Sequence, residues 1–298
     1  MDPLSRNYNP KATVNNGSCL YPATRIKPNH STILSKELVE TSGLIAFDSE
    51  LWTFNDDTDT AIYILDTVGI IQNKITLPLV TNKDWEEISQ DNKYIYLGDF
   101  GNNSTGNRKD LHILKIEKST ITTSPKIDTI AFSYADQIDF SSKKANKTDF
   151  DCEAFLVTED SIYLFTKQWK LNTTSVYTLP KKPGKYIAHY KSSYNVKGLI
   201  TGLTYLSEKK LIVLCGYNKR LYPFVYLLYD FENHNFFEAN KRKVKLKLPF
   251  HQVEGIATLD GLHYYLSNEH TSLKPLLTIS QKLHFIDLSP YLKNFLEK

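Results

Sequence analysis

The chain has 298 residues, of which 41% are hydrophobic and 23% charged, enough to bury a full core in one large domain or two small ones. Lys and Arg total 36 against 33 Asp and Glu, and a net charge of +3 is too small to indicate nucleic acid or a membrane surface as the partner. No apolar run approaches the roughly 18 residues that a membrane helix needs, so we expect no transmembrane segment.

The first 28 residues are polar and precede the first strand-like sequence. We therefore expect an N-terminal arm or linker over residues 1–28 and a single domain over residues 29–298. The three cysteines, Cys19, Cys152 and Cys215, share no metal-ligand spacing, and this argues against a zinc site and against thiol catalysis.

Most of the chain has the composition of β-strands. Tyr (19) and Phe (15) are abundant, and short β-branched or aromatic runs alternate with clusters of Gly, Asn, Asp, Ser and Pro. Helical periodicity is nearly absent. The exception is the tail 288–298, where Ser289 and Pro290 are typical of a helix start.

One pattern recurs five times: an acidic or polar entry, a small residue, an apolar strand, a short turn and a second, aromatic-rich strand. The copies cover residues 40–57, 84–103, 151–169, 200–218 and 253–270. Aligned at Ser42, Glu86, Glu153, Thr201 and Glu254, they are separated by 44, 67, 48 and 53 residues. Units of about 40–50 residues made of short strands are typical of propeller blades.

The repeat therefore predicts an all-β fold, a β-propeller of five or six blades, each a four-stranded antiparallel sheet. Five copies favour five blades, but the long second interval contains further strand-like sequence, DTIAFSYADQIDF, which would suit a sixth. A β-sandwich is the alternative architecture, and the regular recurrence counts against it.

Carboxylates stand where the first strand of most copies begins. Side chains two apart on a strand share one side, and on the innermost strand of a blade that side faces the central channel. The predicted metal ligands are Glu40, Asp84, Glu86, Asp151, Glu153 and Glu254. Carboxylate oxygens suit Ca²⁺ or Mg²⁺. The alternative is that Lys167, Arg108, water or neighbouring backbone amides compensate the charges.

The second strand of each copy runs antiparallel to the first, so its polar exit joins the same face. The predicted ligand-binding residues are Asn55, Asp56, Asp99, Asn102, Arg108, Lys167, Trp169, Asn268 and Glu269. Trp169 offers an aromatic face for stacking, or else packs against the rim. The Gly- and Asn-rich loop 98–111 is either an anion-binding loop or a structured turn. No nucleophile motif is present, so no catalytic residue is assigned.

A set of short motifs over residues 38–290 resembles a family of secreted and surface β-propeller proteins of Bacteroidetes, many with type IX secretion tails. The motifs are ETSGL, LWTFNDD, DWEEIS, YLGDFGNN followed by GNRKDL, DFDCEAF, YLFTKQW, LPKKPG, LITGLTY, PFHQVEGIA and YLSNE. The resemblance implies a secreted, cell-surface or outer-membrane location, with the periplasm as the alternative. It implies no settled activity.

Residues 2–22 resemble a second element of such proteins, a short segment that runs from a Cys just before Met-Asp-Pro to Gly-Ser-Cys. The resemblance implies a Cys upstream of Met1, either as a disulfide partner for Cys19 or as a lipid anchor. The alternative is a flexible polar arm.

Three functions fit these expectations. The first is a binding module whose acidic face holds a divalent cation, Ca²⁺ in particular, together with a glycan, peptide or protein partner. The second is a Ca²⁺-dependent hydrolase of the lactonase or phosphotriesterase type, in which a channel-bound metal polarises a substrate oxygen. The third is a structural subunit of an outer-membrane assembly that docks through the basic strand 241–247.

Overall fold

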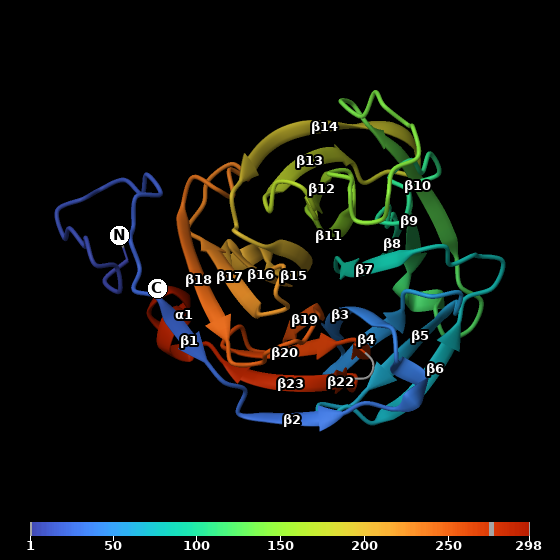
Figure 1. Cartoon of the computed structure of the whole chain (residues 1–298), viewed down its shortest axis with the longest axis horizontal. Coiled ribbons are helices and arrows are strands. Elements are labelled where there is room, and N and C mark those ends of the chain that lie inside the picture. Colours follow the sequence, from blue (N-terminus) through green and yellow to red (C-terminus); the bar gives the residue numbers. More distant parts are fainter. Residues whose placement is uncertain (1, 274–276, 298) are drawn as a thin grey trace.

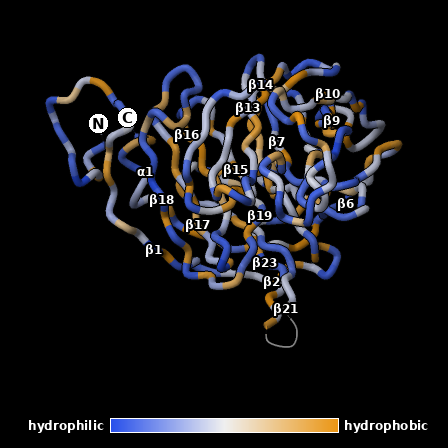
Figure 2. Tube along the Cα trace, turned by 45° about the horizontal axis from the view of Figure 1, so that its top comes forward, coloured by the Kyte–Doolittle hydropathy of each residue, from blue (hydrophilic) through white to orange (hydrophobic). Residues whose placement is uncertain are grey.

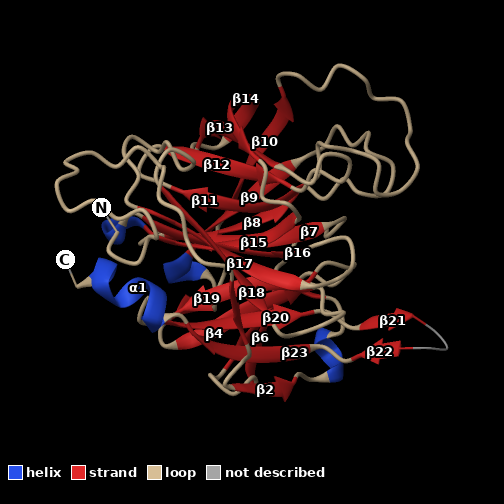
Figure 3. Cartoon of the chain, turned by 60° about the vertical axis from the view of Figure 1, so that its left-hand side comes forward, coloured by secondary structure: helices blue, strands red, loops and turns tan. Residues whose placement is uncertain are grey.

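The computed structural model describes residues 2–273 and 277–297, and strands dominate them (Figure 3). In this part of the chain the helical elements are α1 (Ser289–Leu296) and the 3-10 helices Lys36–Leu38, Lys118–Thr120 and Ser207–Lys209. The predicted all-β class is confirmed, and the helix expected in the tail is α1. Among the described helices, none has the length and apolar character to cross a membrane.

Most strands belong to five four-stranded antiparallel units. Unit 1 contains β3 (Thr41–Phe47), β4 (Glu50–Asn55), β5 (Ala61–Leu65) and β6 (Ile71–Thr76); unit 2 contains β7 (Trp85–Gln90), β8 (Tyr94–Asp99), β9 (His112–Glu117) and β10 (Ile127–Tyr134). Unit 3 contains β11 (Cys152–Val157), β12 (Ser161–Thr166), β13 (Thr174–Pro180) and β14 (Gly184–Tyr194); unit 4 contains β15 (Leu199–Leu206), β16 (Leu211–Tyr217), β17 (Pro223–Tyr229) and β18 (Asn240–Leu246). Unit 5 contains β19 (Val253–Thr258), β20 (His263–Asn268), β23 (Lys282–Asp287) and β2 (His30–Ile33).

The strand-like sequence in the long second interval forms β10, the outer strand of unit 2. It pairs with β9 and, in parallel, with β14, so that units 2 and 3 share one eight-stranded sheet. The extra residues of this interval thus extend an existing unit. The described strands therefore contain five such units, as the five sequence copies predict.

The five first strands β3, β7, β11, β15 and β19 contact one another in this order, and β19 returns to β3. They close a ring around a common centre, with the later strands of each unit further out (Figure 1). Five apolar clusters fill the spaces between successive units, and Figure 2 shows the hydrophobic stretches concentrated along the strands. Burial between units is the main contribution to the stability of the ring.

Segments from the two ends of the chain meet in unit 5. Its outermost strand, β2, precedes all of the units in the sequence and pairs antiparallel with β23. The short strand β1 (Thr24–Ile26) adds in parallel to the edge of unit 4, and the hairpin β21 (Thr271–Leu273) with β22 (Leu277–Ile279) follows β20. Within the expected N-terminal arm, the Asp2 carboxylate accepts hydrogen bonds from the hydroxyls of Tyr21 and Tyr229.

A β-bulge interrupts the pairing of the first and second strands in every unit. The register shifts lie between Ser42 and Ile45, Trp85 and Glu87, Cys152 and Ala154, Ile200 and Gly202, and Val253 and Gly255. Four of the five positions at which the sequence copies align, Glu86, Glu153, Thr201 and Glu254, are therefore bulge positions. The fifth, Ser42, pairs with Phe54 directly before the bulge of unit 1. A bulge bends its strand and redirects the side chain of the extra residue.

Glycine beside a bulge allows neighbouring units to approach closely. A Cβ added to Gly255 would lie 2.6 Å from Ser267 Oγ and 2.7 Å from Leu44 Cβ, at the contact between units 5 and 1. We expect Gly255→Ala to lower the free energy of unfolding by about 1–3 kcal/mol, as overpacking of a core does. Urea unfolding measures this, with the exposed Ser141→Ala as control. A Gly255→Ala protein as stable as the parent would contradict this close contact.

Candidate functional site

Acidic side chains gather at the end of the ring where the first strands begin. They form two groups in which one oxygen of each carboxylate lies within 4.8 Å of the others. The outer trio is Glu40, Asp56 and Glu269, and the inner trio is Glu86, Asp151 and Glu153. The outer trio is half-buried and the inner trio is buried. This end of the ring is called the acidic mouth below.

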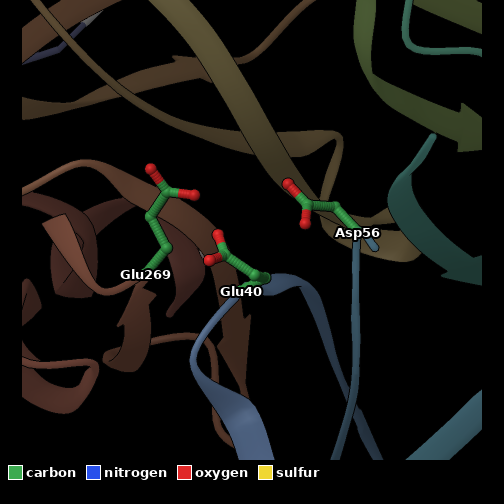
Figure 4. Close-up of side chains that lie close together, drawn as sticks. All are labelled: Glu40, Asp56 and Glu269. Atoms are coloured by element: carbon green, nitrogen blue, oxygen red, sulfur yellow. The ribbon is translucent and has the colours of Figure 1, made fainter. Parts of the chain in front are cut away.

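The outer trio comes from three chain segments at the contact between units 1 and 5. Glu40 precedes β3, Asp56 follows β4 and Glu269 follows β20, and the three side chains project into a common space (Figure 4). Gln252 donates a hydrogen bond to Glu269. No Lys or Arg among the described residues forms an ion pair with any of the three carboxylates.

Burial and mutual repulsion favour the protonated forms of the outer trio. Burial raises the pKa of Asp56 to about 8, and the charges of Glu269 and Glu40 add to the effect. Burial, followed by the charge of Glu40, raises the pKa of Glu269 to about 7. The pKa of Glu40 is raised in the same direction, by burial and then by Asp57. Near neutral pH the trio therefore retains protons unless a cation joins it.

The inner trio has a cation of its own. The buried ammonium of Lys167 lies 2.9 Å from Glu153 Oε2 and 4.8 Å from the centre of the Trp169 ring. Burial lowers the pKa of Lys167, but the surrounding carboxylates, Glu153 first, raise it well above its ordinary value. Asp151 accepts hydrogen bonds from the backbone N–H of Asn102 (2.6 Å) and from Trp169 Nε1 (2.7 Å). Compensation by Lys167, the alternative weighed from the sequence, thus applies to the inner trio.

Glu254 connects the two trios electrostatically. Its carboxylate is buried, and Oε2 has no hydrogen-bond partner within residues 2–273 and 277–297. Burial raises the pKa of Glu254 to about 8; Lys167 opposes this, while Glu269 and Asp56 reinforce it. The buried oxygen is thus an uncompensated acceptor at the acidic mouth.

All six predicted metal ligands lie at this mouth, but they do not form one group. Glu86, Asp151 and Glu153 make the inner trio, whereas Glu40 is placed with Asp56 and Glu269, which were predicted as ligand-binding residues. Gly101 lies against the carboxylates of Asp84 and Glu86 so closely that an added Cβ would overlap both. Burial, followed by the charge of Asp151, raises the pKa of Asp84 to about 6.

The predicted asparagines use their side-chain amides within the protein. The amide nitrogens of Asn55, Asn102 and Asn268 all donate to backbone carbonyls, at 2.8 to 3.1 Å. The amide oxygen of Asn102 accepts from the backbone N–H of Arg108, and that of Asn268 is bonded to His284 Nε2. These amides hold the loops that carry the acidic residues.

Arg108 is also engaged inside the protein. Its guanidinium donates to Asp99 Oδ1 (2.7 Å), to the carbonyl oxygen of Gly101 (2.9 Å) and to Asp110 Oδ1 (3.2 Å). Loop 98–111 is thereby fixed as a structured turn, the second of the two interpretations drawn from its composition.

The sequence analysis missed Glu87, a fully buried carboxylate near the centre of the ring. Its Oε1 accepts from the N–H of Ile88 (2.9 Å), and its Oε2 accepts from the N–H of Leu203 in unit 4 (2.8 Å). The corresponding residues of the other copies, one position after the aligned residue, are Gly43, Ala154, Gly202 and Gly255. A single glutamate among small residues was the available signal.

We expect Glu87→Gln to destabilise the protein by about 1–3 kcal/mol, because an amide offers one acceptor where the carboxyl group now serves two backbone donors. Denaturant unfolding measures the change. Glu208→Gln, at an exposed position, is the matched control. Equal stability of Glu87→Gln and the parent would show that the hydrogen bond lost in the variant contributes nothing to stability.

The raised pKa of Asp56 predicts a pH dependence. A carboxyl whose pKa is about 8 in the folded chain and near 4 when unfolded costs no stability below the unfolded pKa. As pH rises from the unfolded pKa to the folded pKa, this carboxyl group lowers the free energy of unfolding progressively. In EDTA, we therefore expect Asp56→Asn to gain stability relative to the parent between pH 5 and about pH 8, whereas the exposed Asp128→Asn shows no such trend. Groups common to both proteins, such as Lys243 with its pKa lowered to about 7, cancel in the difference between the melting temperatures.

Comparison with known proteins gives little further identification. No protein-family model and no curated protein matches the chain. The chain is similar to crystal structures of two variants of an exo-β-1,3-galactanase from Phanerochaete chrysosporium, each with β-1,3-galactotriose. For the first, identity is 14% and the TM-score 0.43, with 72% of this chain and 48% of the galactanase covered. For the second, identity is 13% and the TM-score 0.41, with 63% of this chain and 44% of the galactanase covered. The chain spans about half the length of these galactanases, and the scores are too low to assign a fold or an activity by analogy.

Proposed function

We propose that the chain is a five-bladed β-propeller that acts as a cation-dependent binding module. Five four-stranded units whose first strands meet in a closed ring support the propeller assignment, because blades of four strands around a central channel define that architecture. The outer trio is the proposed cation site, and Ca²⁺ is the proposed ion. The acidic mouth is the proposed binding face.

The observation that carries this proposal is the unequal compensation of the two trios. Lys167 lies among the carboxylates of the inner trio, whereas the outer trio lacks a cationic partner within the described residues. Converging carboxylates that are partly removed from water need protons or a cation. The three atoms that converge in the outer trio are all carboxylate oxygens, and hard oxygen donors suit Ca²⁺.

The outer trio also leaves room for a ligand on the ion. Ca²⁺ takes six to eight oxygen ligands, so three carboxylates leave several positions for water or for hydroxyl groups of a bound molecule. Trp169 lies at the same mouth, oriented by its hydrogen bond to Asp151 and half-buried. An aromatic ring at the same mouth as an open cation site suits a glycan, which supplies both hydroxyl groups and an apolar ring face.

An open site of this kind binds Ca²⁺ weakly. Extracellular modules bind Ca²⁺ with dissociation constants of roughly 10⁻⁴ to 10⁻³ M, the range in which so few protein ligands suffice. A secreted or cell-surface location is therefore part of the proposal.

Hydrolysis is the second candidate, and Glu254 is the observation that favours it. A carboxyl group with a pKa of about 8 is protonated at neutral pH and is suited to act as a general acid. Turnover of lactone, phosphoester or glycoside substrates would separate a hydrolase from a binding module.

We expect Ca²⁺ to raise the melting temperature of EDTA-stripped protein at pH 8, where Glu269, with a pKa of about 7, is largely deprotonated and Asp56, with a pKa of about 8, is about half deprotonated. A site filled to 100 times its Kd adds about 2.7 kcal/mol, a shift of several degrees. Asp56→Asn and Glu269→Gln should abolish the shift, and Asp128→Asn should retain it. Proton release on binding, measured by calorimetry in buffers of different ionisation enthalpy, should accompany it.

Each outcome of this experiment has a definite meaning. Loss of the shift in Glu153→Gln together with its persistence in Asp56→Asn would assign the ion to the inner trio instead. No shift with 10 mM Ca²⁺ in the parent protein would overturn the cation proposal. Trp52 and Trp85 are buried, so tryptophan fluorescence during glycan titration reports chiefly on Trp169, with Trp169→Phe as the control.

A further inference from the structure

A cavity opens at the end of the ring opposite the acidic mouth, where the first strands end. Its narrow part, about 130 Å³, is lined by residues of all five first strands, among them Ile45, Gln90, Val157, Tyr205 and Thr258. Its wide part, about 690 Å³, shares Gln90, Val157 and Tyr205 with the narrow part. Small-molecule sites typically measure roughly 300–1,000 Å³. The wide part is therefore large enough for a small ligand.

Positive charge exceeds negative charge around the wide part. Lys93, Lys118 and Lys181 line it together with Asp91 and Glu159. Asp91 is fully engaged, because Lys181 pairs with it at 3.1 Å and its carboxylate also accepts from two backbone N–H groups and a tyrosine hydroxyl. Glu159 is exposed. Two ammonium groups, those of Lys93 and Lys118, remain without a carboxylate contact among the described residues.

Lys118 is the more constrained of these two lysines. Its ammonium donates to the neutral Gln90 Oε1 (2.8 Å) and lies 4.2 Å from the centre of the Phe47 ring. Burial lowers the pKa of Lys118, and the charges of Asp91 and Asp48 oppose this effect. A half-buried ammonium whose hydrogen-bond partner is neutral is stabilised when an anion comes within contact.

We propose that this cavity binds a small anionic ligand, a hydroxyl-rich molecule that carries one carboxylate or phosphate group, such as a sugar acid or a sugar phosphate. Lys118 and Lys93 would contact the anionic group. The polar side chains of Asn92 and Ser207 would face the hydroxyl groups, and Tyr205 offers a surface against which a ring packs.

This site is independent of the proposed cation site. A first strand of six residues, such as β7, spans about 20 Å at roughly 3.3 Å per residue. That distance exceeds the Debye length of about 8 Å at physiological ionic strength. Anion binding at this cavity should therefore need no Ca²⁺ and should persist in Asp56→Asn.

Isothermal titration calorimetry in Ca²⁺-free buffer at physiological ionic strength tests the proposal with four probes: D-glucuronate, D-glucose 6-phosphate, D-glucose and inorganic phosphate. We expect at least one charged sugar to bind about tenfold or more tightly than both D-glucose and inorganic phosphate. Preference between the two charged sugars identifies the carboxylate or the phosphate as the recognised group.

Two lysine variants assign the binding to this cavity. Lys93→Gln and Lys118→Met should each lower the affinity for the charged sugar by about fivefold to tenfold. Lys247→Gln should not, because Lys247 is exposed directly after β18 and does not line the cavity. Lys93 is exposed, so its variant keeps the test valid even if Lys118→Met disturbs packing. Three results would each overturn the proposal. The charged sugars could bind no more tightly than D-glucose, or no more tightly than inorganic phosphate. The third is unchanged affinity for the charged sugar in folded Lys93→Gln and Lys118→Met.

Discussion

The β-bulge near the start of each first strand is the constraint on which the rest of the structure depends. It lets five strands approach one another at the centre of the ring while the extra residue leaves the regular alternation. In unit 4 that position holds Thr201, whose Oγ1 donates to the carbonyl of Val253 in the next unit (2.5 Å). In unit 1 Ser42 lies directly before the bulge, and its Oγ donates to the carbonyl of Glu86 (2.8 Å). In the other three units the bulge position holds a glutamate. The bulge region of the first strand thus both connects neighbouring units by hydrogen bonds and positions the glutamates of the acidic mouth.

The residue after the second strand determines how that charge is compensated. The five equivalent positions hold Asp56, Phe100, Lys167, Asn218 and Glu269. Lys167 supplies the cation of the inner trio, while Asp56 and Glu269 add negative charge beside Glu40. Because units 1 and 5 are neighbours, the two acidic positions fall together.

The repeat made the five units and the position of the acidic mouth predictable from the sequence. Alignment at Ser42, Glu86, Glu153, Thr201 and Glu254 selected the bulge position in four units and the residue directly before the bulge in unit 1, since a bulge leaves similar small or polar residues in each copy. The outer trio could not be predicted as a group, because it forms only where the first copy meets the last, and β2 completes that last unit from the N-terminal segment. The sequence also does not reveal whether a polar side chain is hydrogen-bonded within the protein. Arg108 and the three asparagines were predicted to bind a ligand, and the structure places them in internal hydrogen bonds.

Compensation within the ring is therefore local. Lys167 forms its ion pair with Glu153 of the inner trio and lies against the aromatic ring of Trp169. Its charge also lowers the pKa of Glu269, but burial and the charge of Glu40 outweigh this effect. Glu254 interacts electrostatically with both groups: Lys167 lowers its pKa, whereas Glu269 and Asp56 raise it. The outer trio must then take its positive charge from solution, either as protons or as a metal ion. Under the proposed function, protons and Ca²⁺ would compete for the same oxygens, and binding at the acidic mouth would then depend on both pH and cation concentration.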